Sequence, residues 1–114
     1  MGKVGRFVTD PKVGVYCQIV LDSHEKIVVN HEKGGVEGGR LTIEAVKFMG
    51  FGSDRILALT LDSPEGEAAL AELTRDASEG SVEATPVGAF VHYVKDCASV
   101  ADVRTRCATL LARR

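Results

Sequence analysis

The sequence predicts an α+β fold, with a mostly antiparallel sheet that begins with a β-hairpin and two or three helices packed on one face. Strand-like alternation of apolar residues comes early in the chain, and stretches with helix caps come later. No long internal repeat interrupts this order. A length of 114 residues fits a single domain over residues 1–114, and a hydrophobic content of 45% is enough to fill a core.

The clearest strand pattern lies in residues 13–21, where every second residue is apolar. A shorter stretch precedes it and ends at the turn signal Asp10-Pro11. The polar cluster at residues 22–25 then interrupts the alternation, and β-branched residues resume at 27–29. This arrangement predicts a hairpin with its turn near residues 22–25. Because a hairpin is not stable alone in water, we expect further strands or a helix to cover it.

A glycine-rich segment follows the hairpin, in residues 34–39. Such a run lets the backbone take positive φ angles or lets another group approach it closely. Its glycines do not have the spacing of a phosphate-binding loop, so the sequence predicts no nucleotide site. We treat the segment as a connecting loop and as a candidate binding loop, with the residues Gly34, Gly35, Gly38 and Gly39.

Residues 41–49 fit two patterns. As a helix, the stretch places Leu41, Ala45, Phe48 and Met49 on one face, with Gly50 as a stop. As a strand, it alternates apolar and polar residues almost as well. We favour the helix, because Glu44, Lys47 and Met49 are good helix formers.

The second half of the chain predicts a strand, a helix, a strand and a helix. Residues 54–62 are short and apolar, which is typical of a strand buried on both faces. Ser63 and Pro64 then begin a helix that we expect to end near Ser78-Glu79. Residues 81–96 predict a strand whose first half, which contains Pro86, lies at an edge or forms a bulge. Ser99 and Asp102 predict the start of the last helix, whose apolar stripe comprises Val100, Val103, Cys107, Leu110 and Leu111.

The net charge of −2 argues against nucleic-acid binding, which usually needs a basic domain. The charge is unevenly distributed: residues 62–83 hold seven acids and one arginine, giving −6, and residues 104–114 hold four arginines and no acid, giving +4. We interpret both as solvated helix faces. The alternatives are pairing of the two segments, within one chain or across an oligomer, and binding of an anionic partner by the basic tail.

Three cysteines and no export signal indicate free thiols and a cytoplasmic location. The cysteine and histidine spacings match no metal-binding pattern, so we expect neither a metal nor a cofactor. No apolar run is long enough to predict a membrane span.

The candidate catalytic residues are His92, Asp96, Cys97 and Asp62. In the expected strand, His92 shares a face with Phe90 and could act as an acid or base, although a hydrogen-bonded, half-buried histidine is the commoner case. Cys97 precedes a helix, whose dipole lowers a thiol pKa, but the adjacent Asp96 opposes the thiolate. Asp62 and Asp96 would converge if their strand ends are neighbours, although capping explains both residues equally well.

Three aromatic residues, Phe48, Phe51 and Tyr93, are candidates for an apolar binding surface. For Phe48 and Phe51, the ordinary end of a core helix is the commoner explanation. The leading expectation is a homodimeric binding or accessory module, regulatory in role, for a small molecule or a protein partner. The alternative is a small enzyme that uses His92 with Asp96 or Asp62, or Cys97 as a nucleophile.

Overall fold

The computed structural model describes residues 2–11, 14–32, 39–47 and 52–112. The strands come first: β1 (Lys3–Val4), β2 (Val8–Asp10), β3 (Gly14–Val20), β4 (Lys26–Glu32), β5 (Arg40–Val46) and β6 (Ser53–Thr60). The helices follow: α1 (Pro64–Thr74), the 3₁₀ turn η2 (Val82–Ala84), α2 (Pro86–Val94) and α3 (Val100–Ala112).

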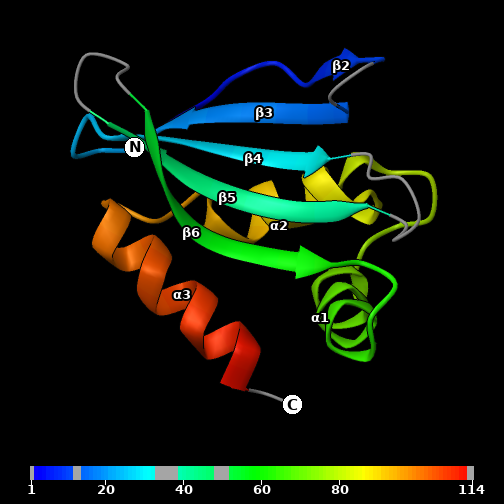
Figure 1. Ribbon diagram of the computed structural model, residues 1–114. Helices are drawn as coiled ribbons and strands as arrows, with labels where there is room; N and C mark the ends of the chain where they lie inside the picture. Colours follow the sequence, from blue (N-terminus) through cyan, green and yellow to red (C-terminus); the bar gives the residue numbers. More distant parts are fainter. Residues whose placement is uncertain (1, 12–13, 33–38, 48–51, 113–114) are drawn as a thin grey trace.

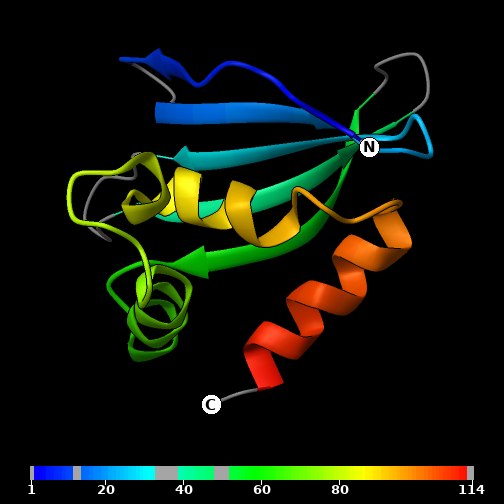
Figure 2. The ribbon, with the colours of Figure 1, turned by 180° about the vertical axis from the view of Figure 1, so that it is seen from behind.

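The six strands form one antiparallel sheet in the order β1-β3-β4-β5-β6, and β2 pairs with the same edge of β3 as β1. All three helices lie on one face of this sheet, as the two opposite views in Figures 1 and 2 show, with α2 between α1 and α3. The predicted α+β class, with its initial hairpin and its one-sided helices, is confirmed.

The predicted hairpin is formed by β3 and β4, which pair from Gly14↔Glu32 to Val20↔Lys26. Its turn closes through hydrogen bonds from the Leu21 amide to the Glu25 carbonyl (2.8 Å) and from the His24 amide to the Leu21 carbonyl (2.9 Å). His24 has a φ of 70°, a left-handed conformation that histidine tolerates in turns. The turn therefore lies where the polar cluster predicts it.

Residues 41–49 are the first correction. Arg40–Val46 form β5, a central strand between β4 and β6, and not the favoured helix. Leu41 and Ile43 face the helices and are fully buried, while Thr42 on the opposite face is 1% exposed. Strand pairing on both sides overrides the modest helix propensity of this segment.

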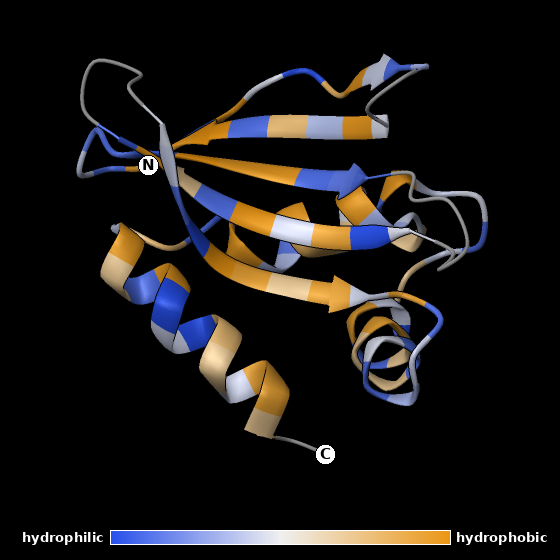
Figure 3. Cartoon of the chain, viewed as in Figure 1, coloured by the Kyte–Doolittle hydropathy of each residue, from blue (hydrophilic) through white to orange (hydrophobic). Residues whose placement is uncertain are grey.

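β6 is a strand, as expected, but its burial differs from the prediction. Leu57 and Leu59 are buried, whereas Ala58 and Arg55 are exposed, so one face of β6 remains open. In the described part of the chain, β6 pairs only with β5 and is an edge strand. Figure 3 shows the resulting alternation of hydrophilic and hydrophobic residues along several strands.

Residues 81–96 are the second major correction, because they form η2 and α2 in place of a strand. Thr85 caps α2: its hydroxyl accepts a hydrogen bond from the Gly88 amide (3.1 Å) and donates one to the Val82 carbonyl (2.6 Å). Pro86 occupies the first helical turn, where its missing N–H costs nothing. Since Phe90 and Val94 are four residues apart, they share the buried side of α2, and His92 is exposed.

α1 has the same capping arrangement, with Ser63 in the place of Thr85. The Ser63 hydroxyl accepts from the Gly66 amide (3.0 Å) and donates to the Thr60 carbonyl (2.7 Å). The cap is as predicted, but α1 ends at Thr74, before the expected end near Ser78-Glu79. In both helices the capping geometry brings a carbonyl from three residues before the cap against a glycine in the first turn.

α3 begins where the sequence predicts, with hydrogen bonds from the Asp102 amide to Ser99 Oγ (3.3 Å) and from the Ala98 amide to the Asp102 carboxylate (3.1 Å). Its buried residues are Val103, Cys107 and Leu110. The hairpin turn holds this helix start, because Glu25 accepts a hydrogen bond from the Val100 amide (3.0 Å) and the Ser23 amide donates to the Ala98 carbonyl (2.9 Å). Along the described residues, no helix is both long and apolar enough to cross a membrane.

Candidate functional site

An apolar groove lies between the start of α2 and the β2–β3 edge of the sheet. We call it the Phe7–Val82 groove. It has a volume of about 290 Å³ and is lined by Phe7, Val15, His31, Val82, Thr85, Pro86 and Val87. Apolar side chains dominate this lining, and the polar groups come from only two residues. This composition is typical of a site that binds apolar groups.

The groove brings together segments that are distant in the sequence. Phe7 precedes β2, which pairs with β3, and Val15 lies on β3 itself. On the other side, η2 carries Val82, and the Thr85 cap fixes the turn from η2 into α2. Phe7 is 40% exposed and Val82 is 56% exposed, so two large apolar side chains stand open to solvent on opposite sides of one groove.

The two polar residues that line the groove already make contacts within the folded chain. Thr85 uses its hydroxyl for the cap of α2, both as donor and as acceptor. His31 lies against the backbone of Gly39, where an added Cβ would be 2.9 Å from His31 Nε2 and 2.9 Å from the Glu32 carbonyl oxygen. Gly39 also has a φ of +99°, so this position of the predicted binding loop requires glycine for both reasons.

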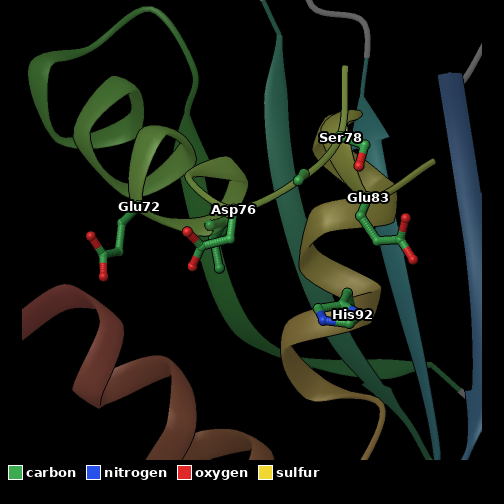
Figure 4. Close-up of a pocket in the computed structure, with 7 residues that line it drawn as sticks. Glu72, Asp76, Ser78, Glu83 and His92 are labelled. Carbon is green, nitrogen blue, oxygen red and sulfur yellow. The ribbon is translucent and has the colours of Figure 1, made fainter. Parts of the chain in front are cut away.

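A second pocket, of about 290 Å³, contains His92. Figure 4 shows the exposed imidazole on α2 with carboxylates on both sides of it: Glu72 and Asp76 from α1 and the segment after it, and Glu83 from η2. The sequence analysis placed His92 beside Phe90 on a strand, and the helix instead turns it away from the core. Its charged neighbours in this pocket were not predicted.

Asp96 and Tyr93, two predicted site residues, hold α3 against α2. The Arg106 guanidinium donates to the Asp96 carboxylate (2.6 Å) and to the Tyr93 carbonyl (3.0 Å), and the Tyr93 hydroxyl donates to the Arg106 carbonyl (2.8 Å). The hydrogen bond from Arg106 lowers the pKa of Asp96, which favours the charged, ion-paired carboxylate. The groups therefore have a structural role between two helices.

Asp62 and Asp96 lie at opposite ends of the sheet. Asp62 follows the end of β6, where Thr60 pairs with Arg40, the first residue of β5. Asp96 precedes Ala98, which is bonded to the hairpin turn at the other end. The structure does not bring these two carboxylates together. Of the other predicted binding residues, Gly34, Gly35, Gly38, Phe48 and Phe51 lie outside the described residues.

The three cysteines, Cys17, Cys97 and Cys107, are buried and free. Burial raises the pKa of the Cys97 thiol, and the nearby Asp96 and Asp102 raise it further, against the effect of Arg106. Burial raises the pKa of Cys107 to about 12. These environments favour the protonated thiol and disfavour a nucleophilic thiolate.

We therefore expect the native protein to react slowly with iodoacetamide at neutral pH, and the unfolded protein to react at the rate of a free thiol. Mass spectrometry of the alkylated protein measures the rate at each cysteine. Modification of Cys97 in the native state at the rate of an unfolded control would contradict a buried, protonated thiol at this position. It would support the hypothesis that Cys97 is a nucleophile.

The acidic and basic segments form ion pairs mainly within or beside their own helices. Arg75 pairs with Glu72 (3.4 Å) and Asp76 (4.0 Å), and Arg106 pairs with Asp96 (2.6 Å). Among the described residues, no ion pair joins 62–83 to 104–112. Arg113 and Arg114, two of the four arginines of the basic segment, lie outside the described residues.

Phe7 and Val82, the most informative residues of the groove, are not in the set of predicted site residues. Val82 falls in the segment that the sequence predicts to be a strand, and valine is common in strands.

Comparison of the chain with protein-family models, with curated proteins and with solved structures found no match.

Proposed function

We propose that this chain is a binding module whose Phe7–Val82 groove takes apolar side chains of a partner protein. The observation that carries the proposal is the pair of exposed side chains, Phe7 and Val82, on opposite sides of one apolar groove. Contiguous exposed apolar surface is uncommon on proteins that bind nothing there. Burial of such surface against a partner removes it from water, and the favourable free energy of this transfer is about 25 cal/mol per Å² of apolar surface.

The size of the groove favours protein side chains over an enclosed small molecule. Pockets for drug-sized ligands usually have volumes of about 300–1,000 Å³ and enclose most of the ligand surface. The groove, at about 290 Å³, is at the lower end of this range, and its own wall residues are partly exposed. One or two apolar side chains of a partner fit this space.

Binding is favoured over catalysis because the predicted catalytic groups are dispersed. Cys97 is buried with a raised pKa, Asp96 is paired with Arg106, and Asp62 lies at the other end of the sheet. Of the predicted catalytic residues, His92 is then the one that still supports the enzyme alternative, together with the carboxylates of its own pocket.

The proposal is tested at low protein concentration with anilinonaphthalene sulfonate, a fluorescent anion whose aromatic rings bind to apolar surface. We expect saturable binding by the native protein. Val82→Glu places a charge in the groove and should weaken the binding by about tenfold or more, which corresponds to about 1.4 kcal/mol. The matched control is Val4→Glu, because Val4 is 43% exposed and does not line the groove.

The control should bind the probe as the native protein does, and the circular dichroism spectra of both variants should be unchanged. Equal binding by Val82→Glu and the native protein would reject the groove as the site.

A further inference from the structure

We infer that the partner in the Phe7–Val82 groove is an extended segment of another protein, which adds an antiparallel strand to the free edge of β2 and places an apolar side chain in the groove. The inference rests on the proposed function and names the form of the partner at the same site. It is carried by the backbone of Thr9, which points away from the sheet beside the groove.

β2 is an edge strand. Within the part of the chain that the structure describes, it pairs with β3 and with no other strand. Figure 1 shows β2 at the rim of the sheet, on the side opposite to β6. Val8 and Thr9 are exposed, so the outer side of β2 is open to solvent.

The hydrogen bonds of β3 show which of its residues face this edge. The Gly5 amide donates to the Gln18 carbonyl (2.8 Å), so the backbone groups of Gln18 point towards the edge that carries β1 and β2. β3 pairs with β4 in one unbroken register, so the direction of its backbone groups alternates regularly along the strand. Those of Tyr16 and Gly14 therefore point towards the same edge as those of Gln18.

Thr9 is then the residue of β2 whose backbone groups are free. Val8 and Asp10 pair with Tyr16 and Gly14 and make the hydrogen bonds to β3. Thr9 lies between them and directs its N–H and C=O away from β3. Across the described ranges of the chain, these two groups have no hydrogen-bond partner. A segment in the extended conformation can bond to both of them.

The side chain opposite Thr9 points to the groove. Thr9 pairs with Val15, which lines the groove, so Thr9 faces the groove side of the sheet. Residues that lie directly opposite each other in antiparallel strands have their side chains on the same face. The partner residue that bonds to the Thr9 backbone therefore also points its side chain to the groove side, where Phe7 and Val82 line the space.

The chemistry of the site selects the segment. Among the described residues that line the groove, none has a carboxylate, an ammonium or a guanidinium group, so the side chain that enters is apolar. Arg6 is exposed on the segment that leads into β2, and within the described residues it forms no ion pair. An extended segment along this edge also passes Arg6, which favours acidic residues next to the apolar one.

Backbone hydrogen bonds to a free sheet edge, together with a pocket for alternate side chains, are a recurrent way of recognising extended peptides. The probe is therefore the blocked peptide acetyl-Thr-Val-Glu-Phe-Glu-Val-Thr-amide, which has its apolar residues on one face and its glutamates on the other. We expect saturable binding by isothermal titration calorimetry. In the complex, the Thr9 amide should become protected from hydrogen exchange, as measured by nuclear magnetic resonance.

Two peptide variants test the strand geometry. N-methylation of the phenylalanine removes the N–H that donates to the Thr9 carbonyl, and should weaken binding by about tenfold or more. The matched control carries the N-methyl group on a glutamate, whose N–H points away from β2, and should bind as the parent peptide does. A peptide with lysines in place of the glutamates should bind more weakly than the parent, and Arg6→Glu should reverse this preference.

Thr9→Pro makes the corresponding change in the protein. Proline is tolerated in an edge strand where the lost N–H faces solvent, so the circular dichroism spectrum should be unchanged. The loss of the outward N–H should weaken peptide binding by about tenfold. Thr9→Val is the matched control, because it changes the side chain and keeps the backbone donor, and it should bind the peptide as the native protein does.

The inference is overturned if the peptide does not bind at millimolar concentration, or if neither N-methylation of the phenylalanine nor Thr9→Pro weakens its binding. Self-association of the native chain that Thr9→Pro abolishes would also overturn it, because the edge would then belong to a second copy. If the Val82-dependent binding of anilinonaphthalene sulfonate persists in these cases, the proposed function stands without strand addition. Failure of both the peptide and the fluorescent probe to bind would reject both proposals.

Discussion

Replacement of Gly88 by alanine is expected to destabilise the folded chain by about 3 kcal/mol or more. Glycine-to-alanine changes within a helix normally stabilise it by up to about 1 kcal/mol. At Gly88, however, the new methyl group would lie against the Val82 carbonyl, 2.6 Å from its carbon atom, and 2.7 Å from Thr85 Oγ1. Both groups belong to the cap of α2 and cannot move without breaking it.

Denaturant unfolding of the two proteins measures the difference in unfolding free energy. Gly80→Ala is the matched control: Gly80 has a φ of +80° but no heavy atom within 4 Å of an added Cβ. It should cost only the backbone strain, about 1–2 kcal/mol. Gly66→Ala should behave like Gly88→Ala, because its methyl group would meet the Thr60 carbonyl. If Gly88→Ala is as stable as the native protein, the described approach of Val82 to α2 is wrong.

Phe90→Ala is expected to cost about 3–5 kcal/mol, the range for removal of a large aromatic side chain from a core. Phe90 is fully buried and belongs to the cluster of apolar residues shared by the sheet and the helices. Its removal leaves a cavity that the strands beneath α2 cannot fill without distortion. The same unfolding experiment measures the loss.

His92→Ala is the control for Phe90→Ala, because His92 is on the exposed side of the same helix. We expect its effect to be within about 0.5 kcal/mol. The pair also tests the secondary structure: in a strand, residues 90 and 92 would share one face and both changes would disturb the core. A large cost for His92→Ala would therefore argue against α2.

The parts of the fold that the sequence predicts well are those determined by local chemistry. The turn at residues 22–25, the Ser63 cap and the Ser99 cap each contain a serine hydroxyl that accepts a hydrogen bond from a backbone amide two or three residues further on. β5 was harder, because its pattern fits a helix nearly as well, and pairing with β4 and β6 decides its conformation. No residue within 41–49 indicates that β4 and β6 lie on either side of this segment.

α2 was missed although the sequence contained a signal for it. Residues 85–88 read Thr-Pro-Val-Gly and residues 63–66 read Ser-Pro-Glu-Gly. Both place a capping hydroxyl, a proline and a glycine at the same spacing, and both begin a helix with the same hydrogen bonds. The β-branched residues around Pro86 concealed the repetition.

The groove could not be predicted, because it depends on how η2 packs near the β2–β3 edge. Phe7 and Val82 come from segments with no local interaction, and each residue alone resembles an ordinary core side chain. Exposure identifies them, and exposure is a property of the assembled structure.

The order of the elements has a consequence for synthesis on the ribosome. In the part of the chain that the structure describes, all six strands precede α1, α2 and α3, so these strands emerge before the helices that cover them. During that interval the apolar face that carries Ile19, Ile27 and Ile43 is exposed to water. Since domains begin to fold while they are being made, the nascent chain passes through a stage in which this face is open to aggregation or to chaperones.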